Sequence, residues 1–262
     1  ANFTKELIDN YNIDCDVTGE NNFVVAHHKN KFDQIKEQAE VYKSEFGIET
    51  KIYSKKEFDE VGHGGTEQFG AFSYKPGFAI NPLKFVNGLA KHALSKKLKI
   101  YEHTKVEKFK KENGSYLLRT NEGSIKTKKI VVATNGFYQE GLIPEMDGRV
   151  LPVISNIIVT RPLSNEELNL HNFNTYAPIA NSKNLLYYYR KLPDNRILFG
   201  TRGDFEGSDK SDQNRANDME QFLKNIFPKW SNVTIDYNWR GLIALSQKLT
   251  PSIGKIDNEE IY

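Results

Sequence analysis

The feature that most constrains the fold is a change of hydrophobic period along residues 99–136. Apolar and polar residues alternate in four short segments, which are Lys99–Tyr101, Thr104–Phe109, Tyr116–Thr120 and Ser124–Thr127. Asn-Gly and Glu-Gly dipeptides lie between the later segments. Period-two alternation with such turns predicts strands joined by hairpins. The last three segments are therefore expected to form a three-stranded meander, and Lys99–Tyr101 is expected to be a short strand before it.

The meander leads into the run Lys129-Ile130-Val131-Val132-Ala133. An uninterrupted apolar run of this kind is typical of a strand that is buried on both faces. It ends at Thr134-Asn135-Gly136, where small polar residues let backbone amides approach a phosphate closely. The competing interpretation is an ordinary strand end, since strand-to-helix turns are common.

Two helices are predicted in the first hundred residues by apolar side chains at three- and four-residue spacing. The first covers residues 30–46, with Asn30 as its N-cap. The second opens at Asn81-Pro82, a capping residue followed by a first-turn proline. Its expected buried face consists of Leu83, Val86, Leu89, Ala90 and Ala93.

Residues 150–203 show further alternating segments separated by polar loops rather than by helices, which favours an antiparallel sheet. A third helix is expected at Ser211–Phe227, stopped by Pro228. The predicted class is therefore α+β. A mostly antiparallel domain is expected to be interleaved with part of a Rossmann-like, nucleotide-binding α/β domain.

Composition argues against several classes of protein. No apolar run approaches the roughly 20 residues that span a bilayer and no signal-peptide pattern opens the chain, so a cytoplasmic protein is expected. The single cysteine, Cys15, excludes an internal disulfide, and the six histidines show no metal-binding spacing. No metal is therefore expected.

Basic charge is concentrated in one segment, because residues 91–130 hold 12 Lys and Arg against 4 Glu. The lysines alternate with apolar residues on expected strands, so a solvated sheet face is favoured and no nucleic-acid partner is expected. A positive field near an anionic cofactor is a further interpretation.

A series of motifs resembles one enzyme family in order and spacing. The motifs are Tyr74–Pro82, Lys99–Val106, Val131–Phe137, Tyr187–Arg190, Ile197–Gly203, Trp239–Gly241 and Pro251–Gly254. Together they resemble the glycine oxidase, sarcosine oxidase and D-amino-acid oxidase family of FAD-dependent oxidoreductases, and most closely its γ-glutamylputrescine oxidase branch.

The resemblance implies where FAD and substrate would lie. It makes Val106 an adenine contact through its backbone, and it brings Thr134, Asn135 and Gly136 near the diphosphate. Pro251, Ile253 and Gly254 become flavin-side residues by the same resemblance. The implied domains are 1–80 as a helix with the first part of the substrate domain, 81–149 as a partial FAD-binding domain, 150–245 as the antiparallel substrate domain, and 246–262 as the start of a C-terminal FAD-binding segment.

For the substrate, an amine or amino acid, the sequence offers Tyr188 and Arg190. Alternate strand positions send both to one face, where arginine could bind a carboxylate through two hydrogen bonds. A solvent-facing arginine over a packed tyrosine is the equal alternative. Trp239 is a third candidate, with core packing as its alternative, and Arg202 and Arg240 are weaker ones.

Two departures from the family pattern concern the cofactor. No G-x-G-x-x-G follows a strand, and Gly62-His63-Gly64-Gly65, with Glu67 at the third glycine position, is expected to be a flexible loop. The chain also stops at Tyr262, before the segment that the family places under the flavin. We therefore expect a portion of a longer enzyme, inactive alone and unable to bind FAD tightly.

The resemblance implies oxidation of a C–N bond to an imine by hydride transfer to flavin, a step that needs no obligatory acid-base side chain. No catalytic residue is assigned. Two alternatives stay open: a dehydrogenase that passes electrons to a quinone or another carrier, and a noncatalytic binding or structural module.

Overall fold

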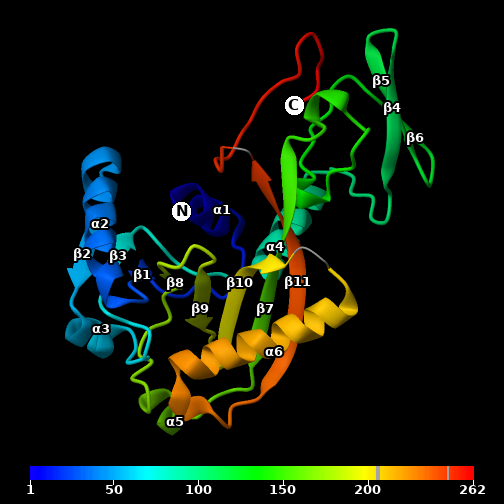
Figure 1. Ribbon diagram of the computed structural model, residues 1–262. Coiled ribbons are helices and arrows are strands. Elements are labelled where there is room, and N and C mark those ends of the chain that lie inside the picture. Colours follow the sequence, from blue (N-terminus) through cyan, green and yellow to red (C-terminus); the bar gives the residue numbers. More distant parts are fainter. Residues whose placement is uncertain (205–206, 247) are drawn as a thin grey trace. The chain divides into compact units, whose positions relative to one another are not determined.

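The computed structural model describes residues 1–204, 207–246 and 248–262 (Figure 1). The chain divides into two compact units, each made of two segments. Unit 1 holds residues 1–98 and 155–240, and unit 2 holds residues 99–154 and 241–262. The assignment of the helix after residue 81 to a partial FAD-binding domain, together with the meander, stays a prediction. Compactness groups that helix with unit 1.

The described helices are α1 (Asn2–Tyr11), α2 (Phe32–Phe46), α3 (Lys55–Val61), α4 (Pro82–Ser95), α5 (Asn165–Asn169) and α6 (Asp209–Ile226). The described strands are β1 (Asn22–Val25), β2 (Glu49–Tyr53), β3 (Ala71–Lys75), β4 (Val106–Glu112), β5 (Ser115–Thr120), β6 (Ser124–Thr127), β7 (Val150–Thr160), β8 (Ile179–Asn181), β9 (Tyr187–Lys191), β10 (Ile197–Asp204) and β11 (Ile235–Ser246).

The larger sheet has eight strands in the order β11-β7-β10-β9-β8-β1-β3-β2. The pairs β1/β3, β2/β3, β8/β9 and β9/β10 are antiparallel, while β1 and β8 are parallel. The sheet is thus mixed and mostly antiparallel, as the alternating segments of residues 150–203 predicted.

Helix α6 covers one face of this sheet, where it lies across β7, β10 and β11 (Figure 1). Its apolar side chains join the main core, which also contains Phe199, Phe227 and Trp230, all buried. The side chains of Phe227 and Trp230 stack with their ring centroids 4.4 Å apart. The third predicted helix is therefore confirmed, and Pro228 follows its end as expected.

The predicted flexible loop at Gly62–Gly65 is instead packed into the core. His63 is fully buried, and its Nε2 lies 2.8 Å from the Tyr189 hydroxyl. The Gly65 amide donates to His63 Nδ1, so the ring proton is on Nε2 and the imidazole is neutral. Because burial disfavours the charged form, the pKa of His63 falls to about 3. The flexible-loop prediction was wrong because long-range contacts fill this loop.

Helix α4 begins as predicted, with the Asn81 side chain accepting from the Lys84 amide. Its predicted buried face was partly wrong. Phe85 and Leu89 pack against α1 and its following loop, whereas Leu83 and Val86 are 68% and 58% exposed. Helix α4 is thus apolar on two sides, and only one of them is covered in the part of the chain that the structure describes.

The first predicted helix cap was also wrong. His28 caps a 3-10 turn at Lys29–Lys31, and α2 begins only at Phe32. The predicted helix itself is confirmed, and its buried residues Ile35 and Ala39 pack on β2 and β3. The histidine side chain accepts from the Asn30 amide, so a neighbouring polar residue replaces Asn30 in the capping role.

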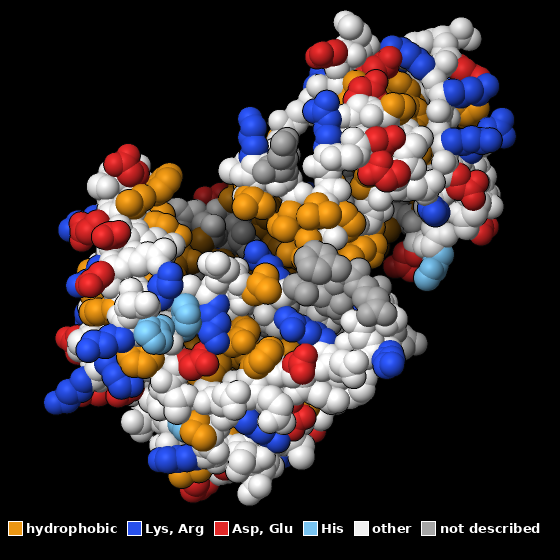
Figure 2. Space-filling view, viewed as in Figure 1, with side chains coloured by type: hydrophobic (Ala, Val, Ile, Leu, Met, Phe, Trp, Pro, Cys, Tyr) orange, Lys and Arg blue, Asp and Glu red, His pale blue; other side chains and the backbone are white. Residues whose placement is uncertain are grey.

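Unit 2 contains the predicted meander as the sheet β4-β5-β6. Asn113 and Gly114 both have positive φ, which their hairpin turn requires. In Figure 2, basic and acidic side chains are interspersed over the face of the protein that is drawn. The lysines of β4 at positions 108, 110 and 111 are exposed, in keeping with a solvated sheet face.

Two predicted strands of unit 2 were wrong. Residues 99–101 form no strand, and residues 129–133 form only a bridge between Ile130 and Ile261, with Val131 74% exposed. A buried parallel strand needs hydrogen-bonding neighbours on both sides, and the described residues provide a single short one at 260–262.

No described helix is long and apolar enough to cross a membrane.

The buried, neutral His63 predicts a pH-dependent stability. Its pKa lies below that of an unfolded histidine, so the unfolded chain binds the extra proton first and stability is lost as pH falls below about 6.5. The free energy of unfolding lost through His63 reaches about 1.4 kcal/mol per pH unit. We expect the urea midpoint of His63→Gln to depend less on pH between pH 6.5 and pH 4, because the substitution removes the titrating imidazole.

The matched control is Phe173→Leu, which also removes contacts around His63 but changes no titrating group. It should lower the midpoint at every pH without altering the slope. An unchanged slope in His63→Gln would contradict the assignment.

Candidate functional site

Strand β9 presents different side chains to its two faces. Tyr187 and Tyr189 point toward the core under α6, where Tyr187 stacks on Phe222 at 5.3 Å between ring centroids. Since side chains alternate along a strand, Tyr188 and Arg190 share the opposite face. Both are only partly buried. The predicted sharing of one face by Tyr188 and Arg190 therefore follows from the packing of their neighbours.

The side chain of Tyr188 crosses the neighbouring strand β10. Its cross-strand partner is Gly200, and a Cβ at that position would overlap the Tyr188 ring. Beyond Gly200 the hydroxyl of Tyr188 lies 2.7 Å from the Oγ of Ser155 on β7. The ring therefore lies flat over the backbone of β10 and links three consecutive strands, and only glycine at 200 allows this.

Arg190 lies two residues further along β9, on the same face as Tyr188. Its Nη2 donates to the carbonyl of Ile80 at 2.7 Å. Burial lowers the pKa of its guanidinium, although arginine stays charged in proteins. Within the described ranges, no carboxylate forms an ion pair with Arg190; the carboxylate of Asp16 acts on it only from a distance and is itself bonded to Lys84. A charged group with donors to spare can bind an anion on this face.

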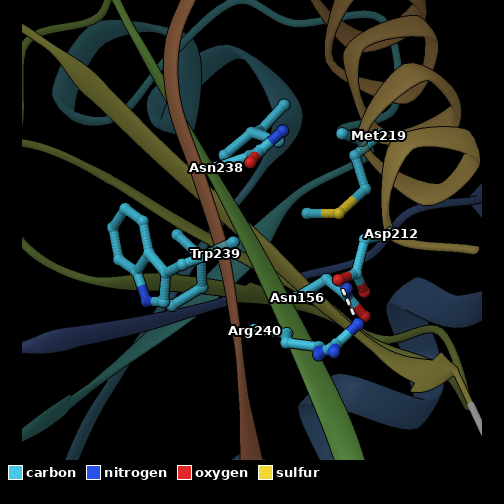
Figure 3. A pocket seen from close by; sticks show the side chains of 9 residues that line it. Asn156, Asp212, Met219, Asn238, Trp239 and Arg240 are labelled. Atoms are coloured by element: carbon cyan, nitrogen blue, oxygen red, sulfur yellow. Dashed lines mark hydrogen bonds and ion pairs between the residues drawn. The ribbon is translucent and has the colours of Figure 1, made fainter. Parts of the chain in front are cut away.

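Trp239 lies on β11 and is 48% exposed, so the core-packing alternative does not describe it. In Figure 3 its ring lies on the other side of β11 from Asp212 and Met219. On the α6 side, Arg240 forms an ion pair with Asp212. Arg240 was one of the weaker candidates for binding substrate, and its charge is already paired within the chain.

A small cavity of about 30 Å³ lies between β7, β11 and α6, next to this ion pair. Asn156 is buried beside it, and its Oδ1 has no hydrogen-bond partner among the described residues. This cavity is on the α6 side of the sheet, away from Tyr188 and Arg190. Its volume is that of roughly one water molecule.

In unit 2, the predicted phosphate turn is a 3-10 turn at Asn135–Phe137. The Gly136 amide donates to the Oδ1 of Asn135 at 2.8 Å, and the Phe137 amide donates to the Thr134 carbonyl. Asn135 Oδ1 also accepts from the Ala244 amide at 3.0 Å. The Asn135 side chain therefore fixes the turn against the end of β11, while the Gly136 amide, which was expected to be available for a phosphate, is engaged within the turn.

The remaining cofactor candidates are dispersed in unit 2. Val106 opens β4 opposite Thr120, just before a register shift. Pro251, Ile253 and Gly254 lie in an extended segment, and Ile253 is fully exposed at 102%. Gln247, in the predicted segment 246–262, lies outside the described residues.

The described residues do not by themselves fit the diphosphate of FAD. The amides of Gly136 and Phe137 are engaged, and the sequence has no glycine-rich phosphate loop. The described residues likewise contain no group of three His, Cys, Asp or Glu that could hold a metal ion.

Comparison with known proteins identifies the family. All 262 residues match the family described as FAD dependent oxidoreductase (DAO). The chain belongs to this family. One relative, the probable oxidoreductase OrdL of Haemophilus influenzae, is 28% identical over 96% of the chain and 57% of its own length. The gamma-glutamylputrescine oxidoreductase of Escherichia coli is 26% identical over 98% of the chain and 59% of its own length. The chain thus spans somewhat more than half of each relative.

Several solved structures share the fold. Glycine oxidase from Geobacillus kaustophilus has a TM-score of 0.80 at 16% identity, over 99% of this chain and 68% of its own. L-proline dehydrogenase from P. horikoshii has a TM-score of 0.79 at 20% identity, over 100% of this chain and 70% of its own. These likenesses confirm the predicted α+β class, and the family match confirms the predicted family.

Sequence reasoning missed two residues of the Tyr188 face, Ser155 and Gly200. Gly200 stood inside a predicted strand, and a glycine there signals a close approach of another group. That signal could have been used. Nothing in the local sequence around Ser155 indicates a bond to a tyrosine two strands away.

Gly200→Ala tests the geometry of this face. The added methyl would overlap the Tyr188 ring, so we expect the ring to leave its position and the bond to Ser155 to break. Overpacking of this kind costs about 1–3 kcal/mol of unfolding free energy, measurable by urea denaturation. Gly123→Ala is the matched control, because nothing lies within 4 Å of its added Cβ. Equal stability of the two variants would contradict the geometry.

Proposed function

We propose that this chain supplies the substrate-binding sheet of a FAD-dependent oxidoreductase that oxidises the C–N bond of an amine or amino acid to an imine. The single observation that carries the proposal is the Tyr188–Arg190 face, with a partly buried guanidinium that has no ion-pair partner among the described residues. Family membership supports the use of FAD.

The names of similar proteins support the substrate class. One relative is a gamma-glutamylputrescine oxidoreductase, and two similar structures are a glycine oxidase and an L-proline dehydrogenase. Each name specifies an amine or an amino acid. We propose a substrate of the same class for this chain, with a carboxylate or another anionic group that Arg190 binds.

Each proposed substrate residue has a distinct task. Arg190 binds the anionic group of the substrate through guanidinium donors not used by Ile80. Tyr188, held by Ser155, provides a fixed aromatic surface beside it. Trp239 offers a half-exposed ring that can cover apolar atoms and exclude water. A bound flavin would supply the chemistry by accepting the hydride.

The proposed cofactor contacts lie in unit 2. Val106 would contact adenine through its backbone, residues 134–136 would lie near the diphosphate, and Pro251, Ile253 and Gly254 would lie on the flavin side. Because the Gly136 and Phe137 amides are engaged, tight FAD binding requires donors beyond the described ones. We therefore expect these 262 residues alone to be inactive.

Two measurements on the full-length protein test the proposal. The flavin absorbance of the protein reconstituted with FAD should bleach when an amine or amino acid is added without oxygen. Peroxide release in air then indicates an oxidase, and reduction of a quinone without peroxide indicates a dehydrogenase. Absence of flavin absorbance after addition of FAD would instead favour a noncatalytic module.

Arg190→Met tests the substrate contact. Removing the cation that pairs with a bound carboxylate costs about 2–4 kcal/mol of binding free energy, or roughly 30- to 1000-fold in kcat/KM. We expect most of this loss in KM, since the arginine binds a group remote from the reacting carbon. Arg119→Met, which removes an exposed arginine on β5, is the control and should leave kcat/KM unchanged. Wild-type kinetics for Arg190→Met would contradict the role of Arg190.

A further inference from the structure

The larger sheet has two very different edges. Strand β2 forms one edge, with five residues that include exposed Glu49 and Lys51. Strand β11 forms the other edge and is twelve residues long. Short, charged edges prevent strands of other chains from pairing. In the sequence of β11 the stretch 235–240 contains neither lysine nor proline, and its two charged residues, Asp236 and Arg240, have opposite signs.

The unit 1 part of β11 is also self-complementary. Its sequence is Ile235-Asp236-Tyr237-Asn238-Trp239-Arg240. If two copies pair antiparallel with Asn238 opposite itself, Asp236 of one copy meets Arg240 of the other. Tyr237 then meets Trp239, and both rings are about half exposed in the single chain, at 56% and 48%. Opposite charges and aromatic pairs directly across two strands are each stabilising.

A groove along this edge adds a second complementarity. It has a volume of about 370 Å³ and runs between α6 and the first half of β11. Glu220 of α6 and Asp236 of β11 both line it. Glu220 is already paired with Lys224, and Asp236 with Arg196. An arginine from a paired strand would therefore add a second cation to the Asp236 carboxylate, a position that an acidic side chain could not take.

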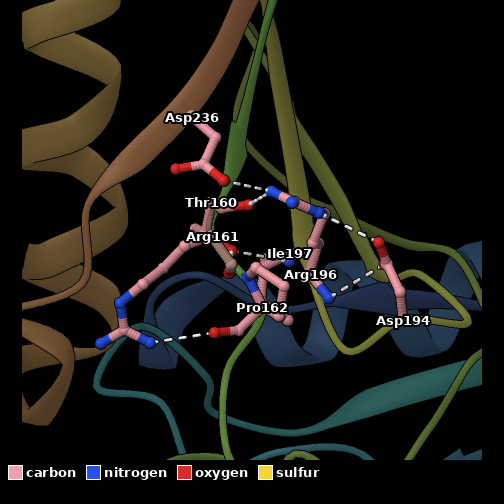
Figure 4. A network of polar contacts seen from close by, with 7 residues as sticks. All are labelled: Thr160, Arg161, Pro162, Asp194, Arg196, Ile197 and Asp236. Carbon is pink, nitrogen blue, oxygen red and sulfur yellow. Dashed lines mark hydrogen bonds and ion pairs between the residues drawn. The ribbon is translucent and has the colours of Figure 1, made fainter.

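The edge is held in place before any partner arrives. Arg196, the residue just before β10, donates to the Asp236 carboxylate at 2.6 Å and to the Thr160 carbonyl at 2.8 Å, as Figure 4 shows. It is also paired with Asp194. This network joins β10, β7 and β11, so the strand that would pair is fixed in position and loses little conformational freedom on association.

We infer that this chain forms a symmetric dimer through β11, with the strands antiparallel and Asn238 on the twofold axis. The partner is a second copy of the same chain. Its recognition rests on the main-chain groups of the edge and on the two Tyr237–Trp239 pairs. The two Asp236–Arg240 pairs form only if Arg240 also reaches across the axis from its ion pair with Asp212.

The twofold axis makes a cysteine at position 238 diagnostic. Two copies would face each other across the strands at about 4.5–5.5 Å between Cβ atoms, close to disulfide geometry. Asn238→Cys is therefore expected to form a covalent dimer under mild oxidation, seen by nonreducing electrophoresis. The native Cys15 is buried and contributes no background. Lys51→Cys, on the opposite edge strand β2, is the control and should form no covalent dimer.

Charge at the same position gives a second test that does not depend on oxidation. Asn238→Lys and Asn238→Asp each place like charges opposite each other, so each alone should raise the dimer dissociation constant at least tenfold in sedimentation equilibrium. An equal mixture of the two should restore dimers, because opposite charges then meet on the axis. Circular dichroism checks that both variants are folded.

Three outcomes would overturn the inference. One is a chain that sediments as a monomer up to high concentration and gives no crosslink in Asn238→Cys. Another is a dimer that both charge variants leave unchanged, which would locate the interface elsewhere. The third is pairing of β11 with an extended peptide of another protein in place of a second copy.

Discussion

The packing of α6 onto the larger sheet determines which side chains of the central strands are available to a ligand. Met219 and Leu223 of the helix, together with Phe227 and Trp230 beyond it, form an apolar core with one face of β7, β9 and β10. Because neighbours on a strand point in opposite directions, that core takes Tyr187 and Tyr189 and leaves Tyr188 and Arg190 on the other face. The candidate site is thus a consequence of core packing.

The parts of the fold that could be predicted from sequence are those that depend on neighbouring residues. The start of α4 follows from Asn81 and Pro82, and the hairpin at Asn113 needs only two residues that accept positive φ. The failures depend on distant residues. Val131 would be buried only between neighbouring strands, and an apolar face on α4 does not say whether another segment covers it.

The same distinction applies to the candidate site. Period-two alternation was enough to predict that Tyr188 and Arg190 share a face. The detailed geometry of that face was not predictable, since the Tyr188 hydroxyl reaches Ser155, which is 33 positions away in the sequence. The phosphate turn was misjudged for a similar reason: Asn135 accepts from Ala244, 109 positions away, and local sequence gives no sign of this bond.

The overlap between Tyr188 and any side chain at position 200 has an evolutionary consequence. A lineage that keeps a large ring at 188 can accept only glycine at 200, whereas one that replaces the ring with a small residue releases that restriction. The two positions should therefore change together among relatives. A glycine opposite an aromatic residue on this strand pair would show that a given relative has kept the ring that we propose lies beside the substrate.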